Sequence, residues 1–261
     1  MENNFKIPND DYKLVWADEF DGDKLNRDNW NVELHEPGWV NAEWQEYVDS
    51  EENIRVSDGK LILRPVKTKK EDGSMYYTSG RVSTEKKQEF IYGYFEAKAK
   101  VPEGKGYLPA FWLMTGDEEK YGQWPRCGEI DMMEVLGDAT DALHGTIHYG
   151  HNMVDGHHQS QGSYRLSEGT FADDFHVFGC EWEPGRISWY VDGIKYFEVT
   201  DWYTAQPDGS GKEEYPAPFN HPFYIILNLA IGGSWVGYPD ENTDFENQAF
   251  EIEYVRVYQK K

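Results

Sequence analysis

The sequence has few cysteines and no long apolar run. Only Cys127 and Cys180 occur in 261 residues, each between strand-like neighbours, so we expect two buried free thiols and no disulfide framework. No apolar stretch approaches the ~18 residues of a membrane span. The opening residues, MENNFKIPNDDYK, also lack the apolar core of a signal peptide. We therefore expect neither a disulfide-stapled nor a membrane-spanning protein.

Positive charge is scarce as well. The chain has 25 Lys and Arg against 48 Asp and Glu, which gives a formal net charge of −23. Such a chain repels polyanions and stays in solution. We expect no nucleic acid and no anionic membrane among its partners, and we expect a monomer.

Aromatic residues, by contrast, are abundant. They make up 16% of the chain, with 10 Trp and 18 Tyr, more than a packed interior usually requires. Some of these rings are therefore expected to face a flat, amphipathic ligand.

The local patterns predict strands and turns. Asp58-Gly59 and Asp192-Gly193 each separate two apolar runs, the arrangement of a type I′ hairpin. The segments 91–101 and 250–258 are rich in aromatic and β-branched residues. No segment sustains helical spacing, and no linker or repeat divides the chain. We predict one all-β domain over residues 1–261, with residues 1–10 as an extension and two packed, curved sheets.

The segment GEIDMMEVLG, residues 128–137, carries three acids in an apolar setting. On a strand, Glu129 and Asp131 share a face, whereas strict alternation would turn Glu134 to the other side as a buried charge. One extra residue at Met132-Met133 would return Glu134 to the face of the other two acids. The three-residue spacing thus predicts a β-bulge.

Three carboxylates on one face repel one another, so at least one should have a raised pKa. A glycosidase needs such a set, with two carboxyl groups ~5–5.5 Å apart in retaining enzymes. A solvated sheet face or a Ca²⁺ site would show the same bare pattern. Chemistry alone leaves the two glutamates interchangeable.

The segment WPRCGEIDMMEVLG resembles the active-site strand of glycoside hydrolase family 16, in the bulged E-x-D-x-x-E form of its laminarinase-like endo-β-1,3-glucanases. Further matching pieces follow in order along nearly the whole chain: LVWADEFDG, GWVNAEWQEY, YTSGRVST, FIYGYFEAKAKVPEGKG, PAFWLM, HGTIH, NLAIGGSWVG and YVRVYQ. The resemblance implies a jelly-roll β-sandwich of two antiparallel sheets with a glucan-binding cleft on its concave face.

The resemblance also assigns roles. It implies that Glu129 is the nucleophile, Glu134 the acid/base and Asp131 the assisting aspartate. The reaction would be a double displacement through a covalent glycosyl-enzyme, without a catalytic cofactor.

Several residues are candidates for substrate binding. Exposed rings can stack on the C–H faces of sugars, and polar side chains can bind the hydroxyl rims. Trp112 could equally be a core residue, and Arg81 alone would most often be a surface charge. The candidates are Asn41, Arg81, Trp112, Trp124, His148 and Trp235.

Five histidines fall within fifteen residues, which raises the possibility of a metal site: His144, His148, His151, His157 and His158. No cysteine or acid completes a familiar ligand spacing among them, so we expect no catalytic metal. The resemblance implies that His148 lies near the catalytic acids instead.

The resemblance also implies a structural Ca²⁺ on the convex side, held by Glu19, Gly59 and Glu253. The acid in the last strand is usually Asp, and the longer Glu253 changes its reach. Two further departures from the family, Val40-Asn41-Ala42-Glu43 in place of GNNE and Leu108 before PAFW, suggest that one sugar subsite differs.

The sequence therefore predicts an endo-β-1,3-glucanase that also accepts mixed β-1,3-1,4-glucan, acting outside the cell on a polysaccharide or oligosaccharide. The alternatives are another family 16 hydrolase, of the agarase or carrageenase type, and a noncatalytic β-glucan-binding protein.

Overall fold

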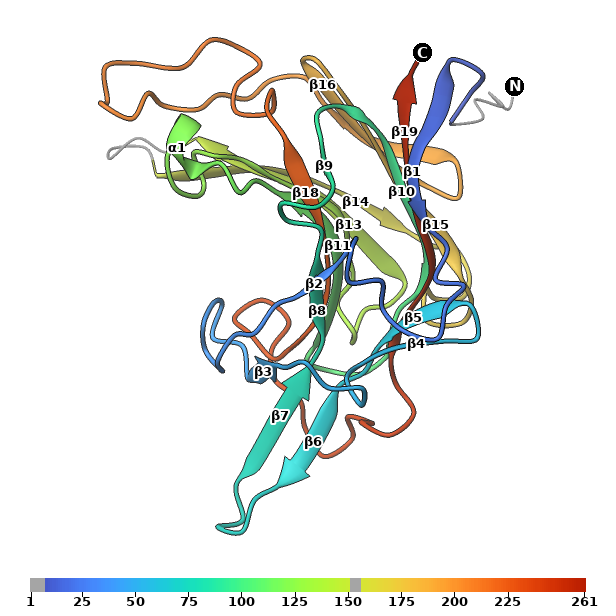
Figure 1. Cartoon of the computed structure of the whole chain (residues 1–261). Coiled ribbons are helices and arrows are strands. Elements are labelled where there is room, and N and C mark those ends of the chain that lie inside the picture. The colour runs from blue at the N-terminus through green and yellow to red at the C-terminus, as the bar shows by residue number, and fades with distance from the viewer. Residues whose placement is uncertain (1–7, 151–155) are drawn as a thin grey trace.

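The fold is a sandwich of two large β-sheets with strongly curved strands (Figure 1). The computed structural model describes residues 8–150 and 156–261. Among these residues no helix has the length and apolar character needed to cross a bilayer. The all-β prediction is confirmed, and the expected extension, residues 1–10, lies largely outside the described residues.

The first sheet has eight antiparallel strands, of which β1 pairs with β19 at its side. In spatial order the strands are β17 (Ile194–Val199), β16 (Arg186–Val191), β15 (His176–Glu183), β10 (Gly93–Lys100), β19 (Phe250–Lys260), β5 (Lys60–Leu63) and β4 (Ile54–Ser57), with β1 (Tyr12–Asp18) beside β19.

The second sheet also has eight strands and carries the acidic segment. Its order is β14 (His157–Arg165), β13 (Ala142–Gly150), β12 (Glu129–Glu134), β11 (Tyr107–Met114), β18 (Phe223–Ile231), β8 (Arg81–Ser83) and β2 (Asn31–Val32), with β9 (Glu89–Phe90) beside β18.

Two smaller elements complete the fold. A three-stranded sheet, β3 (Gln45–Tyr47), β7 (Met75–Ser79) and β6 (Val66–Lys69), extends as an arm below the sandwich (Figure 1). One short helix, α1 (Glu118–Tyr121), is capped by Asp117, whose carboxylate accepts from the Lys120 amide.

The two hairpins that the sequence predicted both form at Asp-Gly turns. Asp58 and Gly59 connect β4 to β5 with φ of 56° and 69°, and Asp192 and Gly193 connect β16 to β17 with φ of 50° and 79°. A type I′ turn needs two successive residues with positive φ, which Asp-Gly adopts at low cost. Both predictions are confirmed, as are the strands within 91–101 and 250–258.

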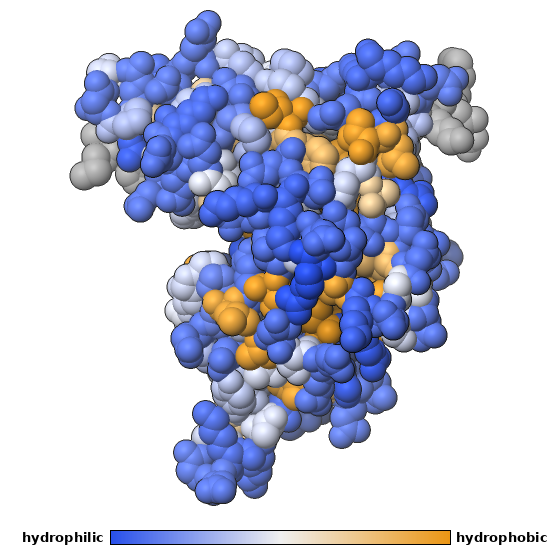
Figure 2. Space-filling model, viewed as in Figure 1, coloured by the Kyte–Doolittle hydropathy of each residue, from blue (hydrophilic) through white to orange (hydrophobic). Residues whose placement is uncertain are grey.

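The core lies between the two large sheets and is rich in aromatic rings. Trp182, Trp189, Phe111 and Phe178 are fully buried there, together with Val, Ile and Leu from both sheets. Cys127 and Cys180 are buried free thiols, as the sequence predicted. The other face of the second sheet is open to solvent, and Figure 2 shows the surface hollowed between an upper and a lower lobe.

Candidate active site

The acidic segment forms strand β12, and its pairing is interrupted where the sequence predicted a bulge. On one side, Asp131 pairs with Thr146 and Glu134 with His144, so two residues of β12 face one residue of β13. On the other side the register to β11 also shifts, between Trp112 opposite Asp131 and Phe111 opposite Met133. Met132 and Met133 are both fully buried in the core. The predicted bulge is confirmed.

The bulge puts the three acids on one face of the sheet. Their partners on β13 are His148, Thr146 and His144, which alternate along that strand and therefore point the same way. The partners on β11 are Met114, Trp112 and Ala110, which also alternate. Glu129, Asp131 and Glu134 consequently face the hollow of the second sheet together.

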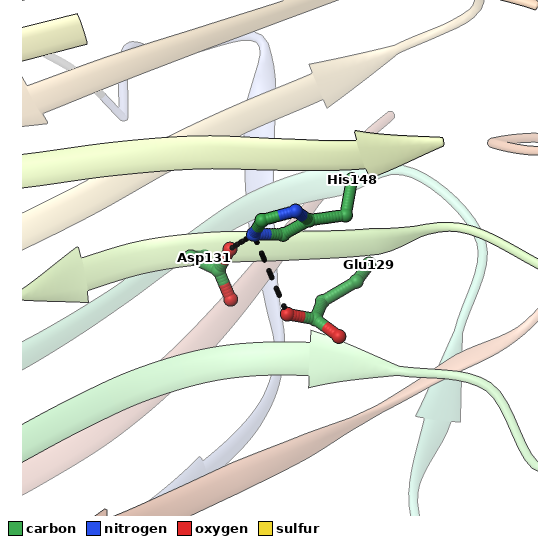
Figure 3. A group of neighbouring side chains, drawn as sticks. All are labelled: Glu129, Asp131 and His148. Carbon is green, nitrogen blue, oxygen red and sulfur yellow. Dashed lines mark ion pairs between the residues drawn. The ribbon is translucent and has the colours of Figure 1, made fainter. Parts of the chain in front are cut away.

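His148 lies against two of the acids (Figure 3). Its Nε2 is 3.2 Å from Asp131 Oδ2 and 3.8 Å from Glu129 Oε1. The orientation leaves the buried Asp131 Oδ2 without an aligned hydrogen bond. Nδ1 of His148 is 2.6 Å from Nε2 of His157 on β14. One imidazole thus bridges the acids and the neighbouring strand.

Burial and crowding hold protons on this group. Burial, and then the charge of Asp131, raise the pKa of Glu129 to about 8. The same two causes raise the pKa of Glu134 well above its usual value. Burial alone would lower the pKa of His148, but Asp131, Glu129 and Glu134 outweigh it and raise that pKa to about 9. The expectation of a raised carboxyl pKa is therefore supported.

The same three side chains could also hold a divalent cation. One ligand atom from each of Glu129, Asp131 and His148 lies within 4.8 Å of the other two. The sequence prediction considered only the spacing of ligands along the chain, and strand pairing brings two acids of β12 to His148 from outside that segment. Of the other histidines, His144 faces Glu134, His157 and His158 lie on β14, and His151 lies outside the described residues.

Exposed tryptophans stand at both ends of the acidic row. Trp124 is 43% exposed, lies 5.9 Å from the His148 ring, and lowers the pKa of Glu129 through a side-chain hydrogen bond. Trp235 is 48% exposed and lies edge to face with His144, the partner of Glu134, at 5.3 Å. The two rings could therefore stack on sugars on either side of the carboxylates.

Trp112 and Arg81 belong to the same face. The Trp112 indole donates to Asn228 Oδ1 at 2.7 Å and is only half-buried, so it is not a residue of the core between the sheets. Arg81 is 6% exposed, pairs with Glu33 and lies over the Trp112 ring at 4.9 Å. The surface-charge alternative for Arg81 is wrong, since neighbouring rings and carboxylates bury its guanidinium.

Asn41 lies in the loop that contacts the Trp235 loop. Its carbonyl accepts from the Ser234 amide at 2.9 Å, and its Nδ2 donates to Glu43 Oε1 at 3.3 Å. Asn41 and Ala42 both have positive φ, of 52° and 57°. Asn tolerates this conformation, whereas Ala adopts it at a cost of about 1 kcal/mol. The departure from the GNNE pattern therefore lies at a strained position beside the cleft.

Four residues of this face were missed from the sequence: Glu33, Trp39, Tyr47 and Asn228. Asn228 links the Trp112 indole to the Tyr47 hydroxyl, to which it donates at 3.0 Å. It is the one polar residue in the apolar strand FYIILNLAI, a signal that could have identified it. Glu33, Trp39 and Tyr47 gave no comparable signal, because only tertiary contacts bring them to Arg81 and Asn228.

The residues expected to hold calcium line one surface hollow away from the acids of β12. Glu19, Gly59 and Glu253 meet there with Asp21 and Asp58, an oxygen-rich set that suits Ca²⁺. Within the structure, Glu19 forms a two-pronged ion pair with Arg256 at 2.7 and 2.8 Å, and Glu253 pairs with Lys98 at 2.7 Å. The donor set fits calcium, but Arg256 and Lys98 already pair with two of its carboxylates, and Lys60 also lines the hollow.

The floor of the hollow thus carries acids that retain protons, between two exposed tryptophans. A β-sandwich with such a site is a glycoside hydrolase in class, because these groups are the ones that cleavage of a glycosidic bond requires. The chain matches the family described as "Beta-porphyranase A-D, GH16 domain" over residues 13–260. It belongs to glycoside hydrolase family 16.

Its relatives include enzymes named for β-glucan. It is 39% identical to glucan endo-1,3-beta-glucosidase A1 of Niallia circulans, in a match that covers 95% of this chain but only 38% of that longer protein. It is 37% identical to a beta-glucanase of Rhodothermus marinus, in a match that covers 95% of this chain and 85% of that protein. The laminarinase catalytic domain of Thermotoga maritima superposes with a TM-score of 0.80 at 38% identity, covering 96% of this chain and 99% of that one.

The raised carboxyl pKa values predict a pH-dependent stability. A glutamic acid whose pKa is higher in the folded state stabilises the fold below its unfolded pKa, and this contribution is lost as pH rises through the folded pKa. Glu134→Gln removes a charge that is costly to bury. We expect it to raise the free energy of unfolding by about 1–2 kcal/mol near pH 9 and to change it little near pH 4.

Thermal melts of both proteins at the two pH values provide the measurement. Glu119→Gln, which alters an exposed carboxylate on helix α1, is the matched control and should show no such difference. An equal effect of Glu134→Gln at both pH values would contradict the raised pKa.

Proposed function

We propose that this protein is a retaining endo-β-1,3-glucanase of the laminarinase type that also cleaves mixed β-1,3-1,4-glucan. The observation that carries the proposal is the bulge at Met132-Met133, which puts Glu134 on the same face as Glu129. Two carboxyl groups on one face can act on the same glycosidic bond, one as nucleophile and one as proton donor. The relatives' names support β-glucan as the substrate.

In the proposed reaction, the Glu129 carboxylate attacks the anomeric carbon while the Glu134 carboxyl gives its proton to the departing glycosidic oxygen. A glycosyl ester on Glu129 results, and the leaving sugar departs with that proton. Glu134, now ionised, takes a proton from water as the water oxygen attacks the same carbon, which frees Glu129. Two inversions retain the anomeric configuration.

The surroundings of the two glutamates support this division of roles. Burial and Asp131 raise the pKa of Glu129 to about 8, and the charge of His148, whose Nε2 lies 3.8 Å from the carboxylate, offsets part of this rise, so the ionised nucleophile becomes populated as the pH approaches 8. For Glu134, burial and the charges of Asp131 and Glu129 outweigh the lowering effect of His148 and keep its pKa well above the usual value. Its register partner on β13 is His144, whose own pKa is lowered by burial and by Arg165. A neutral neighbour leaves the proton on Glu134, as an acid requires. Asp131 lies between them and forms an ion pair with His148, whose Nε2 is 3.2 Å from Asp131 Oδ2.

Substrate contacts follow from the same face. We propose that Trp124 and Trp235 stack on sugars at the two ends of the acidic row, and that Asn41, Arg81, Trp112 and His148 bind or position the chain between them. A polymer of this kind is too large to enter a cell, so we also propose that the protein acts outside the cell. We propose separately that it acts as a monomer.

Two alternatives remain as outcomes of experiment. The matching family description names porphyranases, so a galactan could be the substrate. The formal net charge of −23 is unfavourable for a sulfated galactan, which favours a neutral glucan. A noncatalytic glucan-binding protein would not need both glutamates, and both are present with raised pKa values.

An assay of reducing ends on laminarin, lichenan, agarose, carrageenan and porphyran tests the substrate. We expect the fastest cleavage of laminarin, slower cleavage of lichenan, and an initial β-anomer in the product by NMR. An initial α-anomer would refute the retaining mechanism. Binding of laminarin without cleavage would support the noncatalytic alternative.

The two roles can be separated by matched substitutions. Glu129→Gln should lower kcat about 10³-fold or more on both laminarin and an aryl β-glucoside, because neither leaving group replaces the nucleophile. Glu134→Gln should be as severe on laminarin but much milder in kcat/KM on an aryl glycoside, because kcat/KM reports formation of the glycosyl-enzyme and this leaving group needs little protonation. The reverse pattern would exchange the roles of the two glutamates.

We further propose a structural calcium ion at Glu19, Gly59 and Glu253, remote from the acids of β12. Calcium should raise the melting temperature, and EDTA should lower it without changing kcat at moderate temperature. Glu253→Gln should abolish the effect of calcium. Glu251→Gln, two residues earlier on the same strand, should retain it. A melting temperature that calcium leaves unchanged would count against the site.

A further inference from the structure

The bulge in β12 faces a glycine on the neighbouring strand. Asp131 pairs with Thr146 and Glu134 with His144, so Gly145 is the single residue opposite Met132 and Met133. A Cβ at Gly145 would lie 2.4 Å from Trp189 Cδ1 and 2.7 Å from Trp189 Nε1. The indole of Trp189, from strand β16 of the other sheet, therefore occupies the space that a side chain would take.

Trp189 also bonds directly to the bulge. Its Nε1 donates to the backbone carbonyl of Asp131 at 2.8 Å, in a fully buried setting. The regular pairing of β12 with β13 is interrupted immediately after Asp131. A carbonyl at an interrupted ladder needs another donor, because a buried unpaired acceptor is costly. The indole provides that donor.

A second glycine extends the notch. Gly162 on β14 pairs with Gly145, and a Cβ there would lie 2.2 Å from Phe197 Cγ. Phe197 pairs with Trp189 across β16 and β17, and the two rings are 4.9 Å apart. Two adjacent rings of one sheet thus fit into two paired glycines of the other, which fixes the position of Trp189 under the bulge.

We propose that Trp189 is a positioning residue for catalysis, which holds the bulge through its bond to the Asp131 carbonyl and so keeps Glu134 aligned with Glu129. The proposal rests on the proposed roles of these two glutamates. Trp189 touches no substrate, because it lies in the core between the sheets. Its effect is on the placement of the acid, since the bulge decides which face Glu134 occupies.

Trp189→Phe keeps an aromatic ring and removes the N–H donor. We expect kcat on laminarin to fall about tenfold while KM stays within about twofold. A misplaced acid reduces the stabilisation of the transition state more than it reduces the affinity for the substrate. The limb of the pH profile that reports the proton on Glu134 should also shift. Kinetics across pH, with melting temperatures, provide the measurement.

Trp182→Phe is the matched control. Trp182 is also fully buried in the same sheet and donates to one backbone carbonyl, that of Phe219, at 3.1 Å. It should lose comparable stability and keep its kcat and pH profile. If Trp189→Phe and Trp182→Phe behave alike, Trp189 has only a structural role and the proposal is wrong.

A second variant acts from the other side of the contact. Gly145→Ala should displace the indole and reproduce the loss of kcat, whereas Gly179→Ala, whose Cβ would meet Tyr94 Oη at 2.2 Å in the other sheet, should affect stability alone. If Gly145→Ala keeps the wild-type kcat, the proposal is overturned even where Trp189→Phe fails to fold. A wild-type protein that does not cleave laminarin would refute the proposed function instead.

Discussion

The structure depends on one constraint: a strand that forms part of the core must still keep three carboxylates out of it. Strict alternation from Glu129 would send Glu134 into the apolar layer between the sheets, where an unpaired charge is costly to bury. The bulge resolves the conflict by burying Met132 and Met133 together, so that both adjoining acids remain on the open face. The core gains two apolar side chains and the cleft keeps its acids.

The same arrangement sets the electrostatics of the cleft. Three acids share a small area, and His148 is the imidazole that lies against two of them. Repulsion and burial are relieved by retained protons, which is the condition that acid catalysis requires. The same buried acids therefore lower the stability of the fold at high pH and hold the protons that acid catalysis uses, as functional sites often do.

Much of this could be predicted from the sequence, because the signals were local. Asp-Gly pairs specify their hairpins through the φ angles they permit, and the spacing of Asp131 and Glu134 specifies the bulge through the two-residue period of a strand. Contacts between distant segments had no such signal. Arg81 becomes buried only because Glu33, Trp39 and Trp112 meet around it, and His148 gains its acids only through the pairing of β12 with β13.

The sequence by itself thus determined the all-β class, the Asp-Gly hairpins and the position of the bulge, since each follows from backbone geometry over a few residues. Only the tertiary structure decided what the three acids touch. Strand pairing placed His148 and His144 beside different glutamates, and sheet packing brought the Trp189 indole to the carbonyl of Asp131. These contacts join residues 10 to 58 positions apart. Their geometry is set by how the sheets pack, which no local pattern encodes.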